Sequence, residues 1–529
     1  MHTYRKLLVC LLIVCTLLLT WGEPAALGQS SLPEKPAPGT LEGKARTLTI
    51  ELNKQGFEVL QGYFRLYSQE DCPYSYAVMK TCYGNNPAAP YVIYDVPHWP
   101  EEFVDPATQF AFGPTQAGYS TSFRFDPREA IVILGVLPPP AAYFGLQSYL
   151  FTRQGAFDTQ SVSYQFIANF FPNMLDMFFT GVPNNPQRVQ IFGSLSNSIN
   201  NVVIQRQSGA AFNQPRAFII TPDEFVDNKV RIALNKLSIA DKNIFTEPIP
   251  STLRIGLDAA SDDFVTLIRY AMPEDGGGAG TPSDTWRNNL PLIVLRVRDT
   301  RHGRPAKPYP PVNLETRTAA DELYLKSDLI SLVSAVSQKW GQPCADAECA
   351  DRAVASFRVQ LPPINVVGPN CTEINMNCGG DSQDAVYQLF KTLTLDENVV
   401  YAVAGTLGVR TGNATYVGLG LNGTMKKFGF HNISDKDLQG TASAYASQVN
   451  NTDKFFLYYF TRDCSGLQEL TGGYCYEISE TELPLCNDPT SKTCDNLGFS
   501  IRDYIRPGTQ RGPAAILKLP AMVITLQKP

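Results

Sequence analysis

Histidine is scarce in this chain, with four among 529 residues, and only His98, His302 and His431 lie beyond the N-terminal leader. A site with three histidine ligands would need all three from distant segments. The sequence contains no H-E-x-x-H motif, no Gly-x-Ser-x-Gly elbow and no Walker motif, and no cysteine pair has C-x-x-C spacing. The sequence therefore predicts no metal site and no cofactor.

Clustered charge and long apolar runs are also missing. The formal net charge is -6 and no long run of Lys or Arg is present, whereas phosphate binding draws on clustered cations. Beyond the leader, no apolar run is long enough to span a bilayer. We therefore expect no nucleic-acid partner and no membrane span in the mature chain. The sequence leaves the partner unknown.

The N-terminus has the layout of a signal peptide. Two basic residues precede an apolar run over 7–21, and a Gly-Glu-Pro sequence ends this run before small residues. A spanning helix needs about 20 apolar residues, so cleavage is favoured over an uncleaved anchor. Cleavage after Gly28 would leave Gln29 first. Residues 1–28 thus predict secretion into the extracellular space.

Ten of the twelve cysteines lie beyond the leader and fall into five close pairs. An even number of close-set cysteines behind an export signal is typical of a disulfide-bonded secreted protein. Sequential pairing is expected, although ten cysteines allow many connectivities. The predicted bonds join Cys72 to Cys82, Cys344 to Cys349, Cys371 to Cys378, Cys464 to Cys475 and Cys486 to Cys494.

Five asparagines stand in N-glycosylation sequons, and all lie within residues 370–452. If the source is a eukaryote, this segment should offer glycan-bearing surface loops, because an acceptor asparagine must be exposed. In a bacterium most would be ordinary polar residues. The five are Asn370, Asn413, Asn422, Asn432 and Asn450.

Short apolar runs predict strands in both halves of the chain. The run 130–134 is followed by three prolines and is expected to be a central strand. Three further segments have the apolar spacing of helices, and the first starts with Thr221 as its cap. The predicted strands are 47–52, 91–94, 130–134, 189–192, 217–220, 292–297, 399–407, 414–421 and 455–460, and the predicted helices are 221–237, 325–340 and 384–393.

These elements predict a strand-rich α+β or mixed α/β fold with a few amphipathic helices and disulfide-stapled loops. A proline-dense, basic stretch at 303–313 is the expected boundary between two subdomains. The predicted organisation is a signal peptide over 1–28, a flexible tether over 29–45, an N-terminal α/β unit over 46–302, a linker over 303–313 and a C-terminal disulfide-rich unit over 314–529.

The predicted strand 189–192 runs into Gly-Ser-Leu-Ser-Asn-Ser, and Asp299 stands three residues before His302. This constellation resembles the lipase/esterase family whose first block reads G-D-S. The resemblance implies Ser198 as nucleophile, His302 as base and Asp299 as the residue that orients the base. Ser196 and Asn197 replace the Gly and Asp of the family block, and no G-x-N-D block follows. In the alternative interpretation, 194–198 is a polar loop and His302 belongs to a basic linker.

Adjacent acidic residues at 101–102, 262–263 and 321–322 raise a separate possibility, a carboxylate-pair glycosidase. Adjacent acids are more often a solvated face. The sequence thus leaves the biochemical activity unassigned. Two classes compete, namely a serine-type hydrolase acting on extracellular esters or glycans and a non-catalytic binding or wall-associated module.

Overall fold

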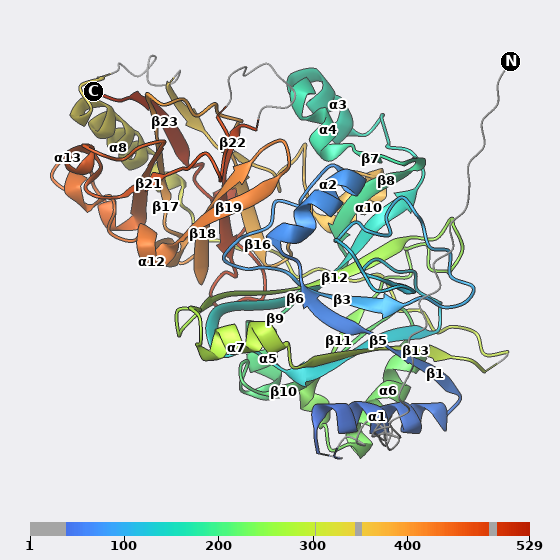
Figure 1. Ribbon diagram of the computed structural model, residues 1–529. Helices are drawn as coiled ribbons and strands as arrows, with labels where there is room; N and C mark the ends of the chain where they lie inside the picture. Colours follow the sequence, from blue (N-terminus) through green and yellow to red (C-terminus); the bar gives the residue numbers. More distant parts are fainter. Residues whose placement is uncertain (1–36, 38, 302, 344–351, 486–494) are drawn as a thin grey trace, which may run out of the picture.

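The computed structural model describes residues 37, 39–301, 303–343, 352–485 and 495–529 (Figure 1). Four β-sheets and several helices, most of them short, make a mixed α+β fold, so the predicted fold class is confirmed. The strands of the first two sheets come from residues 57–299, and those of the other two come from residues 353–527.

The first sheet has the strand order β1-β13-β5-β10-β11. The second has the order β2-β3-β12-β6-β8-β7, with β4 paired to β3 and β9 paired to β6. The bounds are β1 Phe57–Gln61, β2 Tyr63–Leu66, β3 Val92–Pro97, β4 Tyr119–Ser120, β5 Glu129–Val136, β6 Ala141–Gln154, β7 Gly181–Val182, β8 Asn185–Ser194, β9 Ile199–Asn200, β10 Pro215–Thr221, β11 Ile244–Pro248, β12 Asp263–Pro273 and β13 Leu292–Asp299.

The first two sheets pack face to face around one hydrophobic core, and β5 lies in the middle of the first sheet. Ile131 and Ile133 join the core between the sheets, whereas Val132 and Leu134 join the core on the opposite face. This alternation follows the two-residue period of a strand. The predicted central strand is therefore confirmed.

Two helices, α1 (Leu41–Asn53) and α6 (Glu224–Lys236), cover the outer face of the first sheet (Figure 1). The predicted strand over 47–52 is wrong, because these residues belong to α1. Leu48 and Leu52 are buried one helical turn apart, whereas Ile50 between them is 44% exposed. The apolar alternation in this segment coincides with one face of a helix.

The predicted helix after 217–220 is confirmed as α6, but its cap lies two residues later than expected. Asp223 is the cap, and its carboxylate accepts a hydrogen bond from Phe225 N at 2.8 Å. Thr221 remains the last residue of β10, and its hydroxyl donates to Glu129 O at 2.6 Å. Pairing with β5 and β11 thus extends the strand through the expected cap.

The third and fourth sheets have the orders β14-β23-β17-β20-β21 and β15-β16-β22-β18-β19. Helix α8 (Lys326–Lys339) packs its leucine and valine face on the third sheet, so this predicted helix is confirmed. The strand bounds are β14 Ala353–Ala355, β15 Phe357–Arg358, β16 Ala385–Leu389, β17 Val399–Thr406, β18 Tyr416–Gly423, β19 Phe428–Ser434, β20 Phe455–Thr461, β21 Cys475–Glu477, β22 Leu497–Tyr504 and β23 Met522–Gln527.

The predicted helix over 384–393 is wrong, because residues 385–389 form β16 between β15 and β22. Val386 and Gln388 are both buried. A strand that is covered on its faces and paired on both edges shows no clean two-residue alternation. The helix-like spacing of Val386 and Leu389 therefore misled the prediction.

The two halves of the chain interlock around α10 (Gly368–Ile374). Val366, Cys371 and Met376 belong to the core between the first and second sheets, although they follow the first strands of the second half. Backbone hydrogen bonds join Cys378 N to Ile191 O at 2.7 Å and Gly380 N to Phe192 O at 2.9 Å. Residues 359–380 thus form a latch that docks on β8.

Three of the five predicted disulfide bonds are confirmed. They join Cys72 to Cys82, Cys371 to Cys378 and Cys464 to Cys475, with Cα–Cα distances of 5.2, 5.9 and 6.1 Å.

The other two predicted disulfide bonds are not confirmed. Cys344 and Cys349 lie outside the described residues, and so do Cys486 and Cys494. The bond from Cys344 to Cys349 and the bond from Cys486 to Cys494 therefore stay predictions from sequence spacing alone.

The remaining helices are short. Within the described ranges, no helix is both long and apolar enough to cross a membrane. Their bounds are α2 Cys72–Met79, α3 Val162–Phe170, α4 Leu175–Phe178, α5 Asn201–Ser208, α7 Pro282–Asn289, α11 Gly408–Thr411, α12 Asp435–Leu438 and α13 Gln468–Thr471.

Candidate functional site

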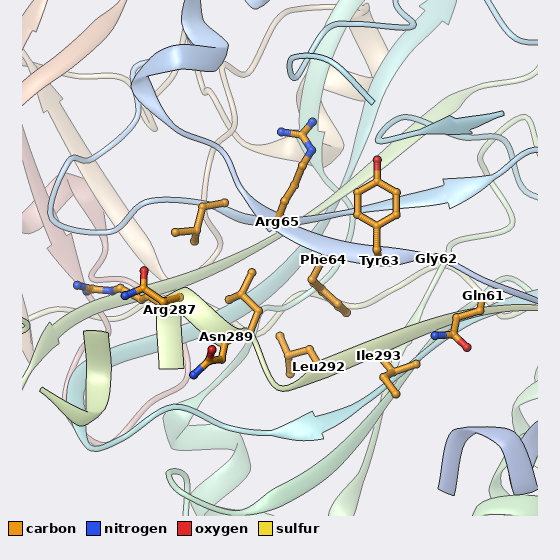
Figure 2. A pocket seen from close by; sticks show the side chains of 12 residues that line it. Gln61, Gly62, Tyr63, Phe64, Arg65, Arg287, Asn289, Leu292 and Ile293 are labelled. Carbon is orange, nitrogen blue, oxygen red and sulfur yellow. The ribbon is translucent and has the colours of Figure 1, made fainter. Parts of the chain in front are cut away.

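A groove of about 440 Å³ opens where the first two sheets part at one edge (Figure 2). It lies between residues 61–66 of β1 and β2 and residues 287–293 at the end of α7 and the start of β13. We call it the β2–β13 groove. Its volume lies within the range of small-molecule and cofactor sites in proteins.

Gly62 creates this groove, because the chain passes there from the first sheet to the second. Gly62 N donates to Val294 O at 3.0 Å, which continues the pairing of β1 with β13. The next residue, Tyr63, already lies opposite Asp95 of β3. A Cβ atom at Gly62 would lie 2.3 Å from Asp95 O, so only glycine fits this crossing.

Side chains alternate along β2. Tyr63 and Arg65 point to one side of the strand, and Phe64 points to the other side, toward Leu292 (Figure 2). The Tyr63 hydroxyl accepts a hydrogen bond from Gln116 N at 3.0 Å. Burial raises the pKa of Tyr63 to about 12, so this phenol stays neutral at physiological pH.

The groove carries positive charge. Arg65 is compensated by Asp95 at 2.8 Å and by Asp71 at 3.4 Å. The guanidinium of Arg287 forms no ion pair and no hydrogen bond with any described residue, and it lies 5.2 Å from the ring centroid of Tyr270. Burial lowers the pKa of Arg287, but a guanidinium stays charged at neutral pH. Among the described residues that line the groove, none is Asp or Glu.

Ser198, the predicted nucleophile, lies between β8 and β9 and is 2% exposed. Its hydroxyl donates to Gln147 Oε1 at 2.5 Å. Gln147 also donates to Glu247, whose buried carboxylate accepts hydrogen bonds from Ser148 at 2.6 Å and from Ser196 at 2.8 Å. Burial raises the pKa of Glu247, while these hydrogen bonds oppose the shift. Ser198 thus belongs to a closed polar network between the sheets.

Asp299, the predicted orienting residue, ends β13 and is fully buried. Its carboxylate accepts hydrogen bonds from Arg301 at 2.8 Å and from Arg304 at 2.6 Å. Burial favours the neutral form, but the two guanidinium groups prevail and hold the pKa of Asp299 at about 2. His302, the predicted base, lies outside the described residues. Ser198 thus contacts Gln147 of the second sheet, whereas Asp299 ends a strand of the first sheet and binds two arginines. The catalytic triad stays a prediction.

The acidic pairs proposed for a glycosidase are held mainly by basic partners. A glycosidase needs two free carboxyl groups that face each other across a cleft, one as the acid and one as the base or nucleophile. Instead, Asp321 accepts from Leu323 N at 2.8 Å. The other five acidic residues form ion pairs, which are Arg153–Asp262 at 2.6 Å, Arg124–Asp263 at 2.9 Å, Arg296–Glu102 at 2.6 Å, Lys518–Glu322 at 2.6 Å and Arg298–Glu101.

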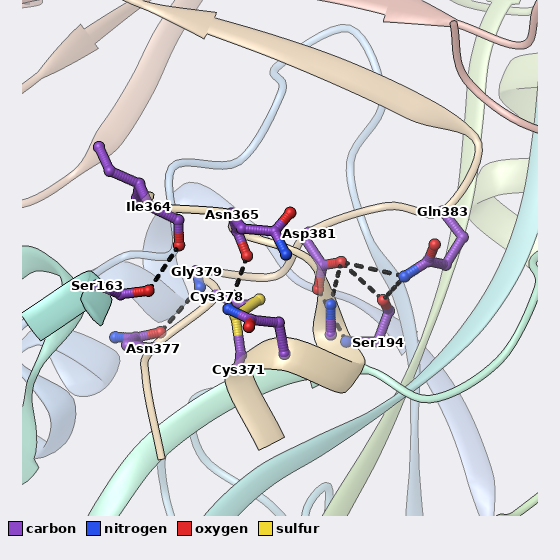
Figure 3. The surroundings of a disulfide bond; sticks show 12 residues. Ser163, Ser194, Ile364, Asn365, Cys371, Asn377, Cys378, Gly379, Asp381 and Gln383 are labelled. Carbon is purple, nitrogen blue, oxygen red and sulfur yellow. Dashed lines mark hydrogen bonds between the residues drawn. A yellow bond between two sulfur atoms is a disulfide. The ribbon is translucent and has the colours of Figure 1, made fainter. Parts of the chain in front are cut away.

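A buried Asp–Ser contact directly follows the latch and lies beside the disulfide Cys371–Cys378 (Figure 3). Asp381 accepts hydrogen bonds from the Ser194 hydroxyl at 2.7 Å, from Ser194 N at 2.8 Å and from Gly368 N at 3.0 Å. Gln383 donates to the same hydroxyl at 2.6 Å. Burial raises the pKa of Asp381. The Ser194 hydroxyl thus donates one hydrogen bond and accepts another. Together with the Asp381 carboxylate, it connects the two halves of the chain.

The sequons differ in exposure. Asn450 is exposed, whereas Asn370, Asn422 and Asn432 are partly buried. Asn413 is fully buried, and its amide donates to Ala320 O at 3.0 Å and to Glu322 at 2.8 Å. Burial of Asn413 argues against a glycan there in the folded chain, because an acceptor amide must be exposed, and glycosylation at the five sequons stays a prediction.

Sequence reasoning missed the β2–β13 groove. Thr281 and Pro282 form a helix-start signal for α7, and this signal could have placed Arg287 in a helix. No local pattern marks the divergence of β2 from β13, because that divergence depends on long-range pairing. No cluster of potential metal ligands is present in the part of the chain that the structure describes.

Comparison of this chain with protein-family models and with curated proteins gives no match.

Proposed function

We propose that this chain is a secreted, disulfide-bonded and N-glycosylated extracellular protein that binds a ligand in the β2–β13 groove. The observation that carries the binding role is an open hollow whose described lining holds Arg287 and no carboxylate. Asp275 and Asp284 lie near enough to act on the charge of Arg287, but neither forms an ion pair with it, and its Nε has no hydrogen-bond partner among the described residues. A groove of this kind suits an anionic ligand, because the ligand would give the Arg287 guanidinium a direct ion-pair partner. The leader sequence and the three disulfides support an oxidising, extracellular location.

The location is tested by expressing the full chain with its leader in a eukaryotic secretory host. We expect the protein in the medium, with Gln29 as its first residue and no cysteine accessible to alkylation after denaturation. Retention inside the cell, or free thiols in the folded protein, would contradict the proposal.

The binding role is tested with the secreted protein and its Arg287→Gln variant. Melting temperatures are compared across panels of anionic and neutral glycans and peptides. A ligand that binds the native state raises the melting temperature. We expect at least one anionic ligand to stabilise the wild type and not the variant.

The competing serine-hydrolase hypothesis needs Ser198 to leave Gln147 and reach solvent. The matched assay compares hydrolysis of short-chain nitrophenyl esters by the wild type and by Ser198→Ala. A binding role predicts equal, background rates, whereas a rate that depends on Ser198 would establish the hydrolase instead.

A further inference from the structure

We propose that the β2–β13 groove takes an extended acidic peptide segment of a partner protein, which pairs with the strand edges as an added β-strand. This inference rests on the proposed binding function and names its ligand class. The strand edges and the charge of the groove carry it.

The free edge of β2 faces the groove. Tyr67 N donates to Tyr91 O, so the backbone groups of Tyr67 and, by alternation, those of Arg65 and Tyr63 face β3. The backbone groups of Phe64 and Leu66 then face the opposite way. Gly62 shares this direction and bonds Val294 of β13. Beyond Gly62 the two strands part, and among the described strands none pairs with this edge of β2.

The facing edge of β13 is also open. Val294 O points toward Gly62, so the carbonyl of Leu292, two residues earlier, points to the same side. β1 does not reach this residue, because its last partner on β13 is Leu295. Leu292 N bonds Leu290 O at 2.6 Å, which leaves the Leu292 carbonyl as the acceptor that a bound chain can use. The groove is thus a wedge between two strand edges that pair at its closed end.

An extended peptide fits such a wedge better than a compact ligand. Its alternate amides can pair with Phe64 and Leu66 on one side, and one further amide can reach Leu292. The apolar side chains of Phe64 and Leu292 face each other across the wedge and offer a contact for one apolar side chain (Figure 2). At about 3.3 Å per residue, β2 provides pairing for three or four residues of the partner.

Arg287 gives the preference for acidic peptides. It lies at the α7 side of the groove and forms no ion pair or hydrogen bond with a described residue, although Asp275 and Asp284 lie near enough to act on its charge. A glutamate or aspartate of the bound strand could form a charge-assisted, bidentate contact with it. Such a contact adds specificity to backbone pairing, which by itself is independent of sequence.

The experiment selects a random seven-residue peptide library displayed on phage against the immobilised secreted protein. We expect enrichment of β-prone peptides with one Asp or Glu. An enriched peptide, made synthetically, should bind Arg287→Gln at least tenfold more weakly than the wild type. The matched control is Arg410→Gln, which removes an exposed arginine of α11 outside the groove and should leave the affinity unchanged.

Two further variants separate binding from folding. Asn289 is exposed and lines the groove, so Asn289→Trp should obstruct the wedge without disturbing the core. N-methylation of the peptide amides that face β2 should weaken binding at least tenfold, whereas N-methylation of the intervening amides should have a smaller effect. If the affinity for the peptide is unchanged by Arg287→Gln, by Asn289→Trp and by N-methylation, the proposal is overturned.

The outcome also distinguishes this inference from the proposed function. If no peptide is enriched but an anionic glycan binds in an Arg287-dependent way, the peptide proposal fails and the binding function stands. If neither class binds the secreted protein, both fail.

Discussion

Gly62 stands where one strand leaves the first sheet and enters the second, and its backbone is too close to Asp95 for any side chain. We predict that Gly62→Ala lowers the free energy of unfolding by more than about 2 kcal/mol, because the added methyl group must displace backbone. Urea denaturation measures this change. Gly278→Ala is the control, because its Cβ would meet open space in an exposed loop, and a similar loss there would refute the steric explanation.

The ion pairs of Asp299 predict a pH dependence of stability. Its pKa is about 2 in the folded chain and near 3.8 when unperturbed, so the unfolded state binds the proton more tightly. The stabilisation is therefore complete above pH 4 and is lost as the pH falls through 2. Asp299→Asn should cost about 2 kcal/mol at pH 7 and less than about 0.5 kcal/mol at pH 2.

Urea denaturation of both proteins at the two pH values checks this prediction. Asp453→Asn, which changes an exposed aspartate, should cost less than about 0.5 kcal/mol at both. An equal cost of Asp299→Asn at pH 7 and pH 2 would show that the carboxylate contributes packing and not charge.

Among single residues, the sequence predicted which asparagines form sequons but not which are exposed. Asn413 carries the same three-residue signal as Asn450, yet it is buried against Glu322 from a segment about ninety residues earlier. Likewise, the spacing of Asp299 and His302 suggested a catalytic pair, and the structure shows the aspartate engaged with Arg301 and Arg304. Such partners are set by tertiary packing, which a local motif does not contain.

At the scale of elements, the latch over 359–380 joins the two halves and contains the disulfide Cys371–Cys378. We predict that the double variant Cys371→Ala/Cys378→Ala loses about 2 kcal/mol of stability, the chain-entropy value for so short a loop. Hydrogen exchange should rise in α10 and β8 together, because backbone hydrogen bonds connect the latch with β8.

The matched control removes the disulfide Cys464–Cys475, which also closes a short loop, with a sequence separation of 11 against 7, and ends at the first residue of β21. It should leave exchange in α10 and β8 unchanged. Equal exchange patterns in the two double variants would contradict the assigned role of the latch.

Elements with strong periodicity were predictable from the sequence, and those whose pattern suits two structures were not. Helices α6 and α8 show long apolar faces, and β5 is a continuous apolar run between a turn and prolines. Residues 47–52 alternate like a strand but form a helix, because helical residues four apart face the same core as well. The apolar residues of 385–389 have a helix-like spacing, but the segment is a strand that pairs with β15 on one edge and with β22 on the other.

At the scale of the whole molecule, glycan occupancy should follow burial. In a eukaryotic secretory host, we predict a glycan at Asn450 and none at Asn413. Asn450→Gln should lower the intact mass by one glycan. Asn413→Gln should leave the mass pattern unchanged and cost about 1 to 3 kcal/mol, because it disturbs buried hydrogen bonds. Glycopeptide mass spectrometry decides, and a glycan on Asn413 of the folded protein would contradict the structure.

The β2–β13 groove depends on the arrangement of the whole molecule. It needs β1 to pair with β13, the chain to cross at Gly62, and α7 to place Arg287 beside the opening. Residues 57–62 lie more than two hundred residues before α7 and β13 in the sequence, so no local signal could have predicted the site. The apolar N-terminal run, the close cysteine pairs and the scarcity of histidine were readable, because each is a local or compositional property.

The measurement that tests the central claim most directly is hydrogen exchange of the purified protein with and without an enriched acidic peptide. Strand addition predicts slower exchange in segments 61–67 and 287–295, with no protection in the latch or in the third and fourth sheets. Protection that is confined to other segments, or no protection at a saturating peptide concentration, would contradict binding in the β2–β13 groove.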